Sequence, residues 1–360
     1  MRELGQLPTT SFHEEAVSKF VTSYLSQLEL EVVADAYGNL VGHYVSGQAG
    51  RRIALVAHMD HPGLEVIAVD STQSKCRLVG WLDPRYLSSG IKVVVFSQGA
   101  AIRGTVTGAQ VTERTAVLEV RSDTPLTVGA FGVFDLVDYE RRGSKVYMRA
   151  ADDLLGCGAM LLAAAEVVSS GVDGDIYFAF TRAEEEGMVG ATLLARTKTI
   201  PEDATVVSLE CSRALPGARS GGGPVIRVGD ARQTFDWQAE HLLQSAAARL
   251  VGEPRFRFQR QLMSGGVCEA TAFQVQGYSV TGVALPLGNY HNQGARFTIA
   301  PEVVEMNDFL SLVRLLRSLF DVANDPPKSA LKERLEQLAD KLAPVLGSSK
   351  IFDGAGWRGG

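Results

Sequence analysis

An apolar run of strand length, residues 176–181 (Ile-Tyr-Phe-Ala-Phe-Thr), is followed two residues later by three consecutive glutamates, Glu184, Glu185 and Glu186. The run does not alternate between apolar and polar residues, which is typical of a parallel strand buried on both faces. Open α/β sheets bind ligands at the carboxyl ends of such strands. The pattern therefore predicts an α/β fold with a negatively charged site at one edge of its sheet.

Two adjacent carboxylates repel each other unless a cation or a proton lies between them. The pair Glu184-Glu185 therefore suggests a metal site in which one residue binds the ion and its neighbour handles a proton. For an isolated run of three glutamates, a solvated acidic loop is the ordinary interpretation. A metal site requires further ligands from elsewhere in the chain.

A second buried strand is predicted over residues 52–57 (Arg-Ile-Ala-Leu-Val-Ala), and it ends at His58. On an extended backbone, His58 and Asp60 point to the same side. A metal-bound imidazole usually donates its second N–H to a carboxylate. His58 is therefore expected to be a ligand and Asp60 the group that orients it, whereas the alternative is a polar strand end where His58 only caps the local backbone.

Three more element ends carry polar groups of the same kind. The apolar run 205–209 ends at Glu210, and the run 279–285 is soon followed by His291. Asp152 and Asp153 stand where an Ala-, Gly- and Leu-rich helix begins, a position where Asp ordinarily caps the helix but where a carboxylate can also bridge two cations. The candidate ligands and base are thus His58, Asp152, Glu184, Glu185, Glu210 and His291.

The middle of the chain has a different texture. Over residues 71–146, short β-rich runs alternate with Gly, Ser, Asp and Pro turns, and no helical period is visible. This segment predicts an inserted β-barrel-like domain, which divides a catalytic domain into residues 1–70 and 147–345.

Helical patterns flank these strands. A capping box formed by Ser11 and Glu14 predicts a surface helix over residues 12–29, and Pro301 predicts the start of another helix. A further helix is expected to carry its leucines at heptad-like spacing and to pack on its own chain, followed by a flexible tail over residues 346–360. Those leucines are Leu331, Leu335, Leu338 and Leu342.

Composition excludes several classes of protein. The net charge of −6 and the absence of a basic cluster argue against nucleic-acid binding. No apolar run reaches transmembrane length, and no signal peptide is visible. The four cysteines lack paired spacing and are expected to be reduced thiols of a cytoplasmic protein.

Two histidines and several carboxylates form a mixed nitrogen and oxygen ligand set, which suits Zn²⁺, or alternatively Co²⁺ or Mn²⁺. One bridging carboxylate, with one histidine and one further carboxylate for each ion, would build a two-metal site with ions about 3.5–4 Å apart. One carboxylate beside a ligand would remain to act as a base.

These motifs, in this order, resemble the glutamyl aminopeptidase or tetrahedral aminopeptidase family of dinuclear metallopeptidases. The similarity extends from residue 1 to about residue 320 and includes the inserted segment. The matching pieces are Ala57-His58-Met59-Asp60 with Gly63, Gly80-Trp81-x-Asp83-Pro84, Ala150-x-Asp152-Asp153 with Gly156-Cys157, Phe180-Thr181-x-x-Glu184-Glu185-x-Gly187, Gly223-Pro224-Val225-Ile226, Gly265-Gly266, and Pro286-Leu287 with Tyr290-His291.

The resemblance implies a three-layer α/β zinc-peptidase domain with a β-rich insertion used in oligomerisation. It implies that one metal ion is bound by His58, Asp152 and Glu210, and the other by Asp152, Glu185 and His291. Glu184 becomes the general base and Asp60 the group that orients His58. Members commonly form dimers that assemble into dodecamers.

The chain departs from the family pattern at three places. Glu210 stands where Asp is usual, and Leu154 stands where an Arg commonly follows the paired Asp residues. The family sequence Gly-Gly-Thr-Asp-Ala becomes Gly265-Gly266-Val267-Cys268-Glu269-Ala270.

The implied activity is the removal of N-terminal residues from peptides by a metal-bridged water and a Glu general base. A carboxypeptidase or N-deacylase on the same site is an alternative, and it would need a cationic group such as Arg213 or Arg296 for the substrate carboxylate. A non-catalytic metal-binding assembly protein is a second alternative, against which the base Glu184 argues.

Overall fold

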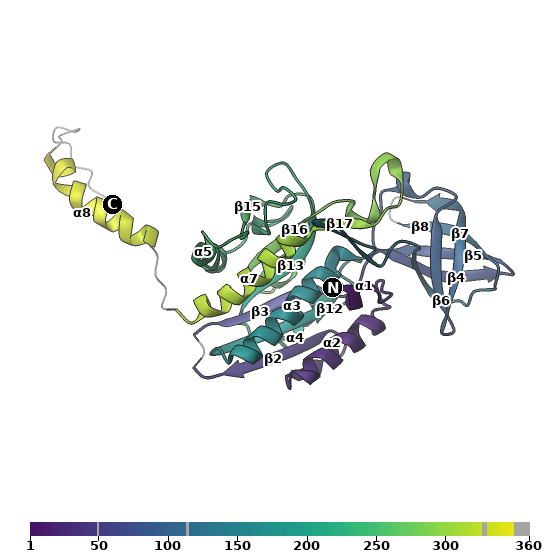
Figure 1. The fold of residues 1–360 in the computed structure, drawn as a ribbon, viewed down its shortest axis with the longest axis horizontal. Helices are drawn as coiled ribbons and strands as arrows, with labels where there is room; N and C mark the ends of the chain where they lie inside the picture. Colours follow the sequence, from purple (N-terminus) through teal and green to yellow (C-terminus); the bar gives the residue numbers. More distant parts are fainter. Residues whose placement is uncertain (49, 113–114, 326–329, 349–360) are drawn as a thin grey trace, which may run out of the picture. The chain divides into compact units, whose positions relative to one another are not determined.

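The computed structural model describes residues 1–48, 50–112, 115–325 and 330–348. Its centre is an eight-stranded mixed sheet with the strand order β1-β2-β12-β3-β13-β16-β14-β15 (Figure 1). The strands of this sheet are β1 (Glu31–Ala34), β2 (Leu40–Ser46), β12 (Gly174–Thr181), β3 (Arg52–His58), β13 (Thr205–Arg213), β16 (Ser279–Leu287), β14 (Val225–Gly229) and β15 (Gln259–Leu262).

The four central strands β12, β3, β13 and β16 are parallel neighbours. They are the four apolar runs that the sequence predicts as buried strands, and most of their residues are buried. Thr181, at the end of β12, pairs with His58, at the end of β3. The carboxyl ends of these strands therefore meet at one edge of the sheet.

Helices cover both faces of the sheet, which makes three layers. One core joins the sheet to α2 (Glu15–Gln27), α3 (Ala151–Ser170), α5 (Trp237–Leu250) and α7 (Met306–Ala323). The other core joins it to α4 (Val189–Thr197) and α6 (Glu269–Gln274). The predicted three-layer α/β architecture is confirmed. Among the described helices, only α3 is long and apolar enough to span a membrane, and most of it is buried here as the central helix.

A closed six-stranded barrel projects from the edge of the sheet where the central parallel strands end (Figure 1). Its strands, in the order of the barrel, are β4 (Gly63–Asp70), β5 (Gln73–Val79), β8 (Ala116–Ser122), β7 (Ala100–Val111), β6 (Lys92–Ser97) and β9 (Phe131–Phe134). The barrel has its own apolar core. The barrel begins at Gly63 rather than at the predicted residue 71. The strand β4 follows soon after His58 and pairs with β5 and β9, so it is a strand of the barrel.

A small three-stranded sheet returns the chain from the barrel to the α/β domain. It consists of β10 (Tyr139–Arg142), β11 (Lys145–Met148) and β17 (Glu302–Glu305). The helix predicted to start at Pro301 begins instead at Met306, because the intervening residues pair with β11. The remaining short helices are α1 (Arg2–Gly5), η1 (Pro84–Tyr86), η2 (Tyr290–Asn292) and η3 (Ala295–Phe297).

The predicted capping box at the start of α2 is wrong. The Ser11 hydroxyl donates to Asp60, and the Glu14 carboxylate accepts from Phe12 and Ala183, so neither side chain caps the helix. The sequence contains the pattern Ser-x-x-Glu, but the two side chains bond to Asp60 and Ala183, which are far away in the sequence.

The helix α8 (Ala330–Ser348) belongs to a separate unit that begins at Asp325. The predicted catalytic domain extends to residue 345, because a helix of the core and an independent helix can have the same heptad-like leucine pattern. Leu335, Leu338 and Leu342 are exposed, so the expected packing on its own chain is not seen within this unit. The predicted tail lies outside the described residues, apart from residues 346–348 at the end of α8.

Candidate metal centre

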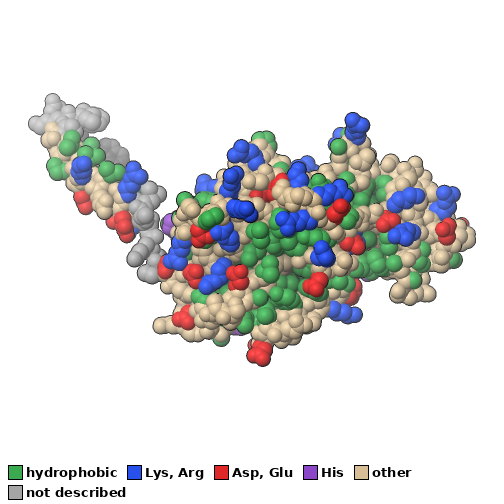
Figure 2. Space-filling model, viewed as in Figure 1, with side chains coloured by type: hydrophobic (Ala, Val, Ile, Leu, Met, Phe, Trp, Pro, Cys, Tyr) green, Lys and Arg blue, Asp and Glu red, His purple; other side chains and the backbone are tan. Residues whose placement is uncertain are grey.

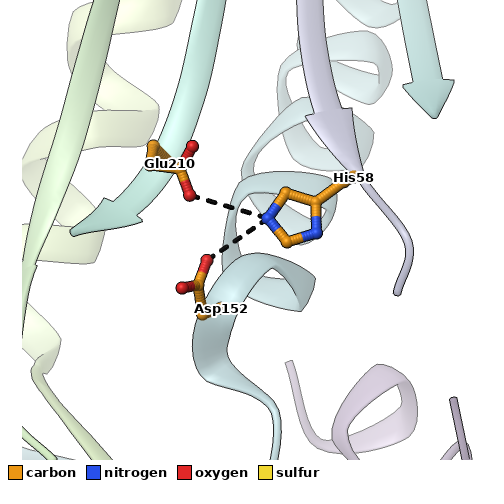
Figure 3. Close-up of side chains that lie close together, drawn as sticks. All are labelled: His58, Asp152 and Glu210. Carbon is orange, nitrogen blue, oxygen red and sulfur yellow. Dashed lines mark ion pairs between the residues drawn. The ribbon is translucent and has the colours of Figure 1, made fainter. Parts of the chain in front are cut away.

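The candidate ligands converge because their strands are parallel and end together. His58 ends β3, Glu210 lies near the end of β13, and Asp152 stands in the first turn of α3 (Figure 3). The turn after β12 supplies Glu185, and the loop after β16 supplies His291. The structure brings together all of the ligands that the sequence predicts.

Two ligand groups share Asp152. In the first, His58 Nε2 lies 3.4 Å from Asp152 Oδ1 and 3.5 Å from a Glu210 oxygen. In the second, His291 Nε2 lies 3.1 Å from a Glu185 oxygen and 3.8 Å from Asp152 Oδ2. Asp152 thus turns a different oxygen toward each histidine. The ligand atoms of each group lie within 4.8 Å of one another.

The residues fit a bound divalent cation. Four buried atoms that face this centre accept or donate no hydrogen bond within the described parts of the chain. They are His58 Nε2, Asp152 Oδ1, Glu185 Oε1 and Glu210 Oε2. Leaving buried polar atoms unpaired is costly, and cations held by the two groups would satisfy them. The mixture of imidazole and carboxylate groups is a typical zinc ligand set.

The other nitrogen of each imidazole is held by the protein. His58 Nδ1 lies 3.1 Å from the Asp60 backbone oxygen and 3.5 Å from its carboxylate. His291 Nδ1 lies 2.7 Å from the backbone oxygen of Trp81, which belongs to the segment after β5. Such contacts fix the ring orientation and leave Nε2 free for a metal ion.

Asp60 does more than orient His58. Its carboxylate accepts hydrogen bonds from the Glu184 and Glu185 backbone N–H groups, at 2.9 and 3.2 Å, and from the Ser11 hydroxyl at 2.6 Å. Burial alone would raise the pKa of Asp60, but the bonds from His58 and Ser11 lower it, so the group remains an acceptor. Asp60 therefore positions the glutamate turn as well as the histidine.

Glu184 lies beside the candidate ligands. Burial raises its pKa well above the ordinary value; His58 opposes this shift, and the charges of Glu210 and Glu185 add to it. A carboxyl group with a raised pKa accepts a proton readily near neutral pH. A bound cation would act in the opposite direction.

The third glutamate connects its turn to the barrel. Glu186 is exposed, but its carboxylate accepts a hydrogen bond of 2.8 Å from the Gly80 backbone N–H in the segment after β5. Nearby, the Asp83 N–H donates to Gln293 Oε1 at 3.0 Å. The barrel is therefore tied to both the glutamate turn and the His291 loop.

Glu14 is a residue of the site that the sequence analysis missed. It is fully buried, binds Arg182 in an ion pair, and accepts a hydrogen bond from the Ala183 N–H. Ala183 has a φ of 50°, in the left-handed region that non-glycine residues rarely adopt. Glu14 and Arg182 hold this turn in place, and no local pattern identifies such a pair.

A pocket opens beside Glu210. Its walls include Ser212, Arg213, Arg227 and Tyr290. The Arg227 side chain is almost fully buried, donates to the Ser212 hydroxyl at 3.2 Å, and has an Nε without a hydrogen bond among the described residues. The Arg213 guanidinium lies over the Tyr290 ring. The pocket thus presents positive charge next to the ligands.

Glu269, at one of the departures from the family pattern, is a buried carboxyl group behind the centre. The Thr181 hydroxyl contacts both Glu269 Oε1 and the Ala57 carbonyl, while Oε2 lacks a hydrogen bond within the described chain. Burial raises the pKa of Glu269 from 4.5 to about 7. Ionised Glu269 therefore destabilises the folded state.

This shift predicts a pH-dependent gain in stability for Glu269→Gln. The penalty is absent below about pH 4.5, grows as the pH rises, and is constant above about pH 7, where it reaches about 3 kcal/mol. We expect urea unfolding of the metal-free proteins to show that the free energy of unfolding of Glu269→Gln rises relative to that of the wild type between pH 5 and pH 8. The exposed Glu166→Gln serves as the control, and a difference that does not change with pH would contradict the prediction.

A three-layer α/β domain with histidines and carboxylates at the carboxyl edge of its parallel strands is an arrangement suited to metal-dependent hydrolysis. Residues 38–315 match the family model of the M42 glutamyl aminopeptidases, and the chain belongs to this family. The resemblance stated from the sequence is confirmed, and the protein is an aminopeptidase of a metal-dependent family.

Relatives agree with this assignment. A putative aminopeptidase from Acetivibrio thermocellus is 25% identical over 326 residues, which cover 85% of this chain and 93% of the relative.

Three solved structures share the fold. The PhTET1-12s dodecamer has a TM-score of 0.72 at 25% identity and covers 88% of this chain and 97% of its own. The Pyrococcus horikoshii TET1 peptidase, which assembles into a tetrahedron or an octahedral shell, has a TM-score of 0.75 at 23% identity and the same coverage. Aminopeptidase APDkam598 from Desulfurococcus kamchatkensis has a TM-score of 0.75 at 21% identity and covers 92% and 97%.

Proposed function

We propose that this protein is a two-metal aminopeptidase that removes the N-terminal residue of peptides. The observation that carries the proposal is Asp152, whose two oxygens face two separate groups of ligands. One ion would be held by His58, Asp152 and Glu210, and the other by Asp152, Glu185 and His291. The ligand types favour Zn²⁺, with Co²⁺ or Mn²⁺ as alternatives.

When bound, the two ions would supply a water of lowered pKa and would polarise the carbonyl group of the scissile amide. The Glu184 carboxylate takes a proton from the attacking water and returns it to the nitrogen of the leaving amine. Asp60 keeps Glu184 in place through the backbone bond to its N–H group. The buried surroundings of Glu184 favour its carboxyl group in the protonated form, which it has between taking the proton and returning it.

The pocket beside Glu210 would receive the side chain of the N-terminal residue. Arg227 has a buried Nε without a described partner, and Arg213 lies near the same wall, so the pocket suits an acidic side chain. The carboxylates of the centre would hold the free α-amine. A free amine bound there would restrict cleavage to the first residue.

We further propose that the protein is a cytoplasmic homo-oligomer, from a dimer up to a dodecamer. The dodecameric relative and the four buried free cysteines support this. Figure 2 shows hydrophobic side chains gathered in the middle of the face that α3 and α7 form, and Leu162 and Leu310 of these helices are exposed. The barrel formed by β4 to β9 would serve the assembly.

The test is a panel of short peptides with Glu, Leu or Lys as the first residue, each also prepared in N-acetylated and in C-terminally amidated form. We expect turnover only with a free α-amine, fastest with Glu, abolished by a chelator and restored by Zn²⁺, Co²⁺ or Mn²⁺. Turnover of blocked substrates alone would show an N-deacylase instead. A preference for free C-terminal carboxylates would show a carboxypeptidase.

A further inference from the structure

Glu302, the first residue of β17, is a fully buried carboxylate that contacts two ligand loops at once. One oxygen, Oε2, accepts hydrogen bonds from the Ala151 and Asp152 backbone N–H groups, at 2.8 and 2.9 Å. The other, Oε1, accepts from the His291 N–H at 2.8 Å. We propose that Glu302 is a positioning residue that sets the spacing between Asp152 and His291 and thereby forms the second metal site.

The His291 loop needs such a restraint because its backbone is strained. Asn289, His291 and Asn292 have φ values of 56°, 54° and 59°, all in the left-handed region. Asn adopts this region readily, whereas His291 costs free energy there unless surrounding contacts fix its conformation. The bond from the His291 N–H to Glu302 acts directly on the residue that must aim its imidazole at the centre.

A second connection keeps the two loops together when Glu302 is altered. The His61 ring lies between the Asp152 backbone oxygen, at 2.7 Å, and Asn292 Oδ1, at 3.0 Å. The Asn292 amide in turn donates to the Arg149 backbone oxygen at 2.7 Å. Changing Glu302 therefore removes the hydrogen bond that holds the His291 backbone, while the two loops remain connected.

The amide variant Glu302→Gln should affect the two metal sites unequally. A carboxamide has one acceptor oxygen, and its NH₂ group repels a backbone N–H. The orientation that keeps the oxygen on Ala151 and Asp152 loses one hydrogen bond, whereas the reverse orientation loses two. The His291 loop is therefore the one released. The site with Glu185 and His291 should weaken, while the site with His58 and Glu210 should not.

The test builds on the proposed two-metal site and measures binding rather than turnover. Metal-free protein is titrated with Zn²⁺ in competition with a chromophoric chelator. We expect Glu302→Gln to raise the Kd for Zn²⁺ at the site with Glu185 and His291 by about 10–100-fold, as changes to residues that hold metal ligands in place do. The Kd of the site with His58 and Glu210 should stay within about threefold. Glu305→Gln, on the same strand, is the matched control and should bind like the wild type.

Equal weakening of both sites by Glu302→Gln, or no weakening, would overturn the proposal, since a mere helix cap gives no selective loss. Amide hydrogen exchange in the metal-free wild type gives a second measurement if the variant fails to fold. The His291 amide should be protected at least as well as that of Asp152, and exchange at the rate of an unstructured peptide would refute the role of Glu302. A wild type that binds only one Zn²⁺ would refute the two-metal function instead, while the exchange result still decides the role of Glu302.

Discussion

Replacing Glu184 by Gln is expected to lower kcat by about 10²–10⁴-fold while both metal ions remain bound. The amide keeps the size and the backbone bond to Asp60 but cannot take a proton from water. Glu184 also lies within reach of His58 and Glu185 as a third group of candidate ligands. Metal analysis beside the rate measurement therefore separates a base from a ligand.

The control for this experiment is Glu186→Gln. It removes one negative charge from the same turn, and its carboxylate contacts Gly80 rather than the centre. We expect its turnover to stay close to that of the wild type. If Glu184→Gln keeps full activity, the assignment of the base fails, and if it loses one metal ion, Glu184 is a ligand.

Replacing Asp152 by Asn is expected to have a comparably large effect for a different reason. Asp152 is the one residue shared by the two ligand groups, so the loss of its charge weakens both. Metal ions contribute several kcal/mol to catalysis of this kind, and each 1.4 kcal/mol is a factor of ten. We expect activity to fall by about 10³-fold and the bound Zn²⁺ to fall below two ions per chain, as measured by elemental analysis after dialysis.

The adjacent Asp153→Asn provides the comparison for Asp152. Asp153 is equally buried, but its Oδ2 accepts no hydrogen bond among the described residues, so an amide NH₂ in that place breaks none. Its Oδ1 accepts from the Gly156 N–H, a bond that the amide oxygen can keep. Retention of both Zn²⁺ ions by Asp152→Asn would contradict the bridging role.

The sequence predicts the sheet and the ligands because both depend on local patterns. Continuous apolar runs distinguish buried parallel strands, and a polar residue after such a run must lie at the edge where the strands end. His58, Glu210 and His291 were found in this way. Their convergence follows from strand direction alone, without any knowledge of side-chain packing.

The supporting residues could not be found in the same way. Glu14, Glu302 and Trp81 act through hydrogen bonds to residues far away in the chain. Ser11 and Glu14 fit a helix-capping pattern, yet their partners are Asp60 and Ala183. A local pattern does not predict which of several possible donors or acceptors a buried side chain will contact. Here both side chains bond to residues far away in the chain instead of capping the helix.

The contact between His291 and the Trp81 carbonyl connects the barrel to the chemistry of the metal centre. An ion held by His291 Nε2 favours the ring position that donates to Trp81, and the same ring position favours the docked barrel. By thermodynamic reciprocity, docking of the barrel would tighten metal binding by the same factor by which the bound ion favours docking. If subunits assemble through the barrel, metal affinity becomes a function of protein concentration, and dilution would weaken metal binding by at most that factor.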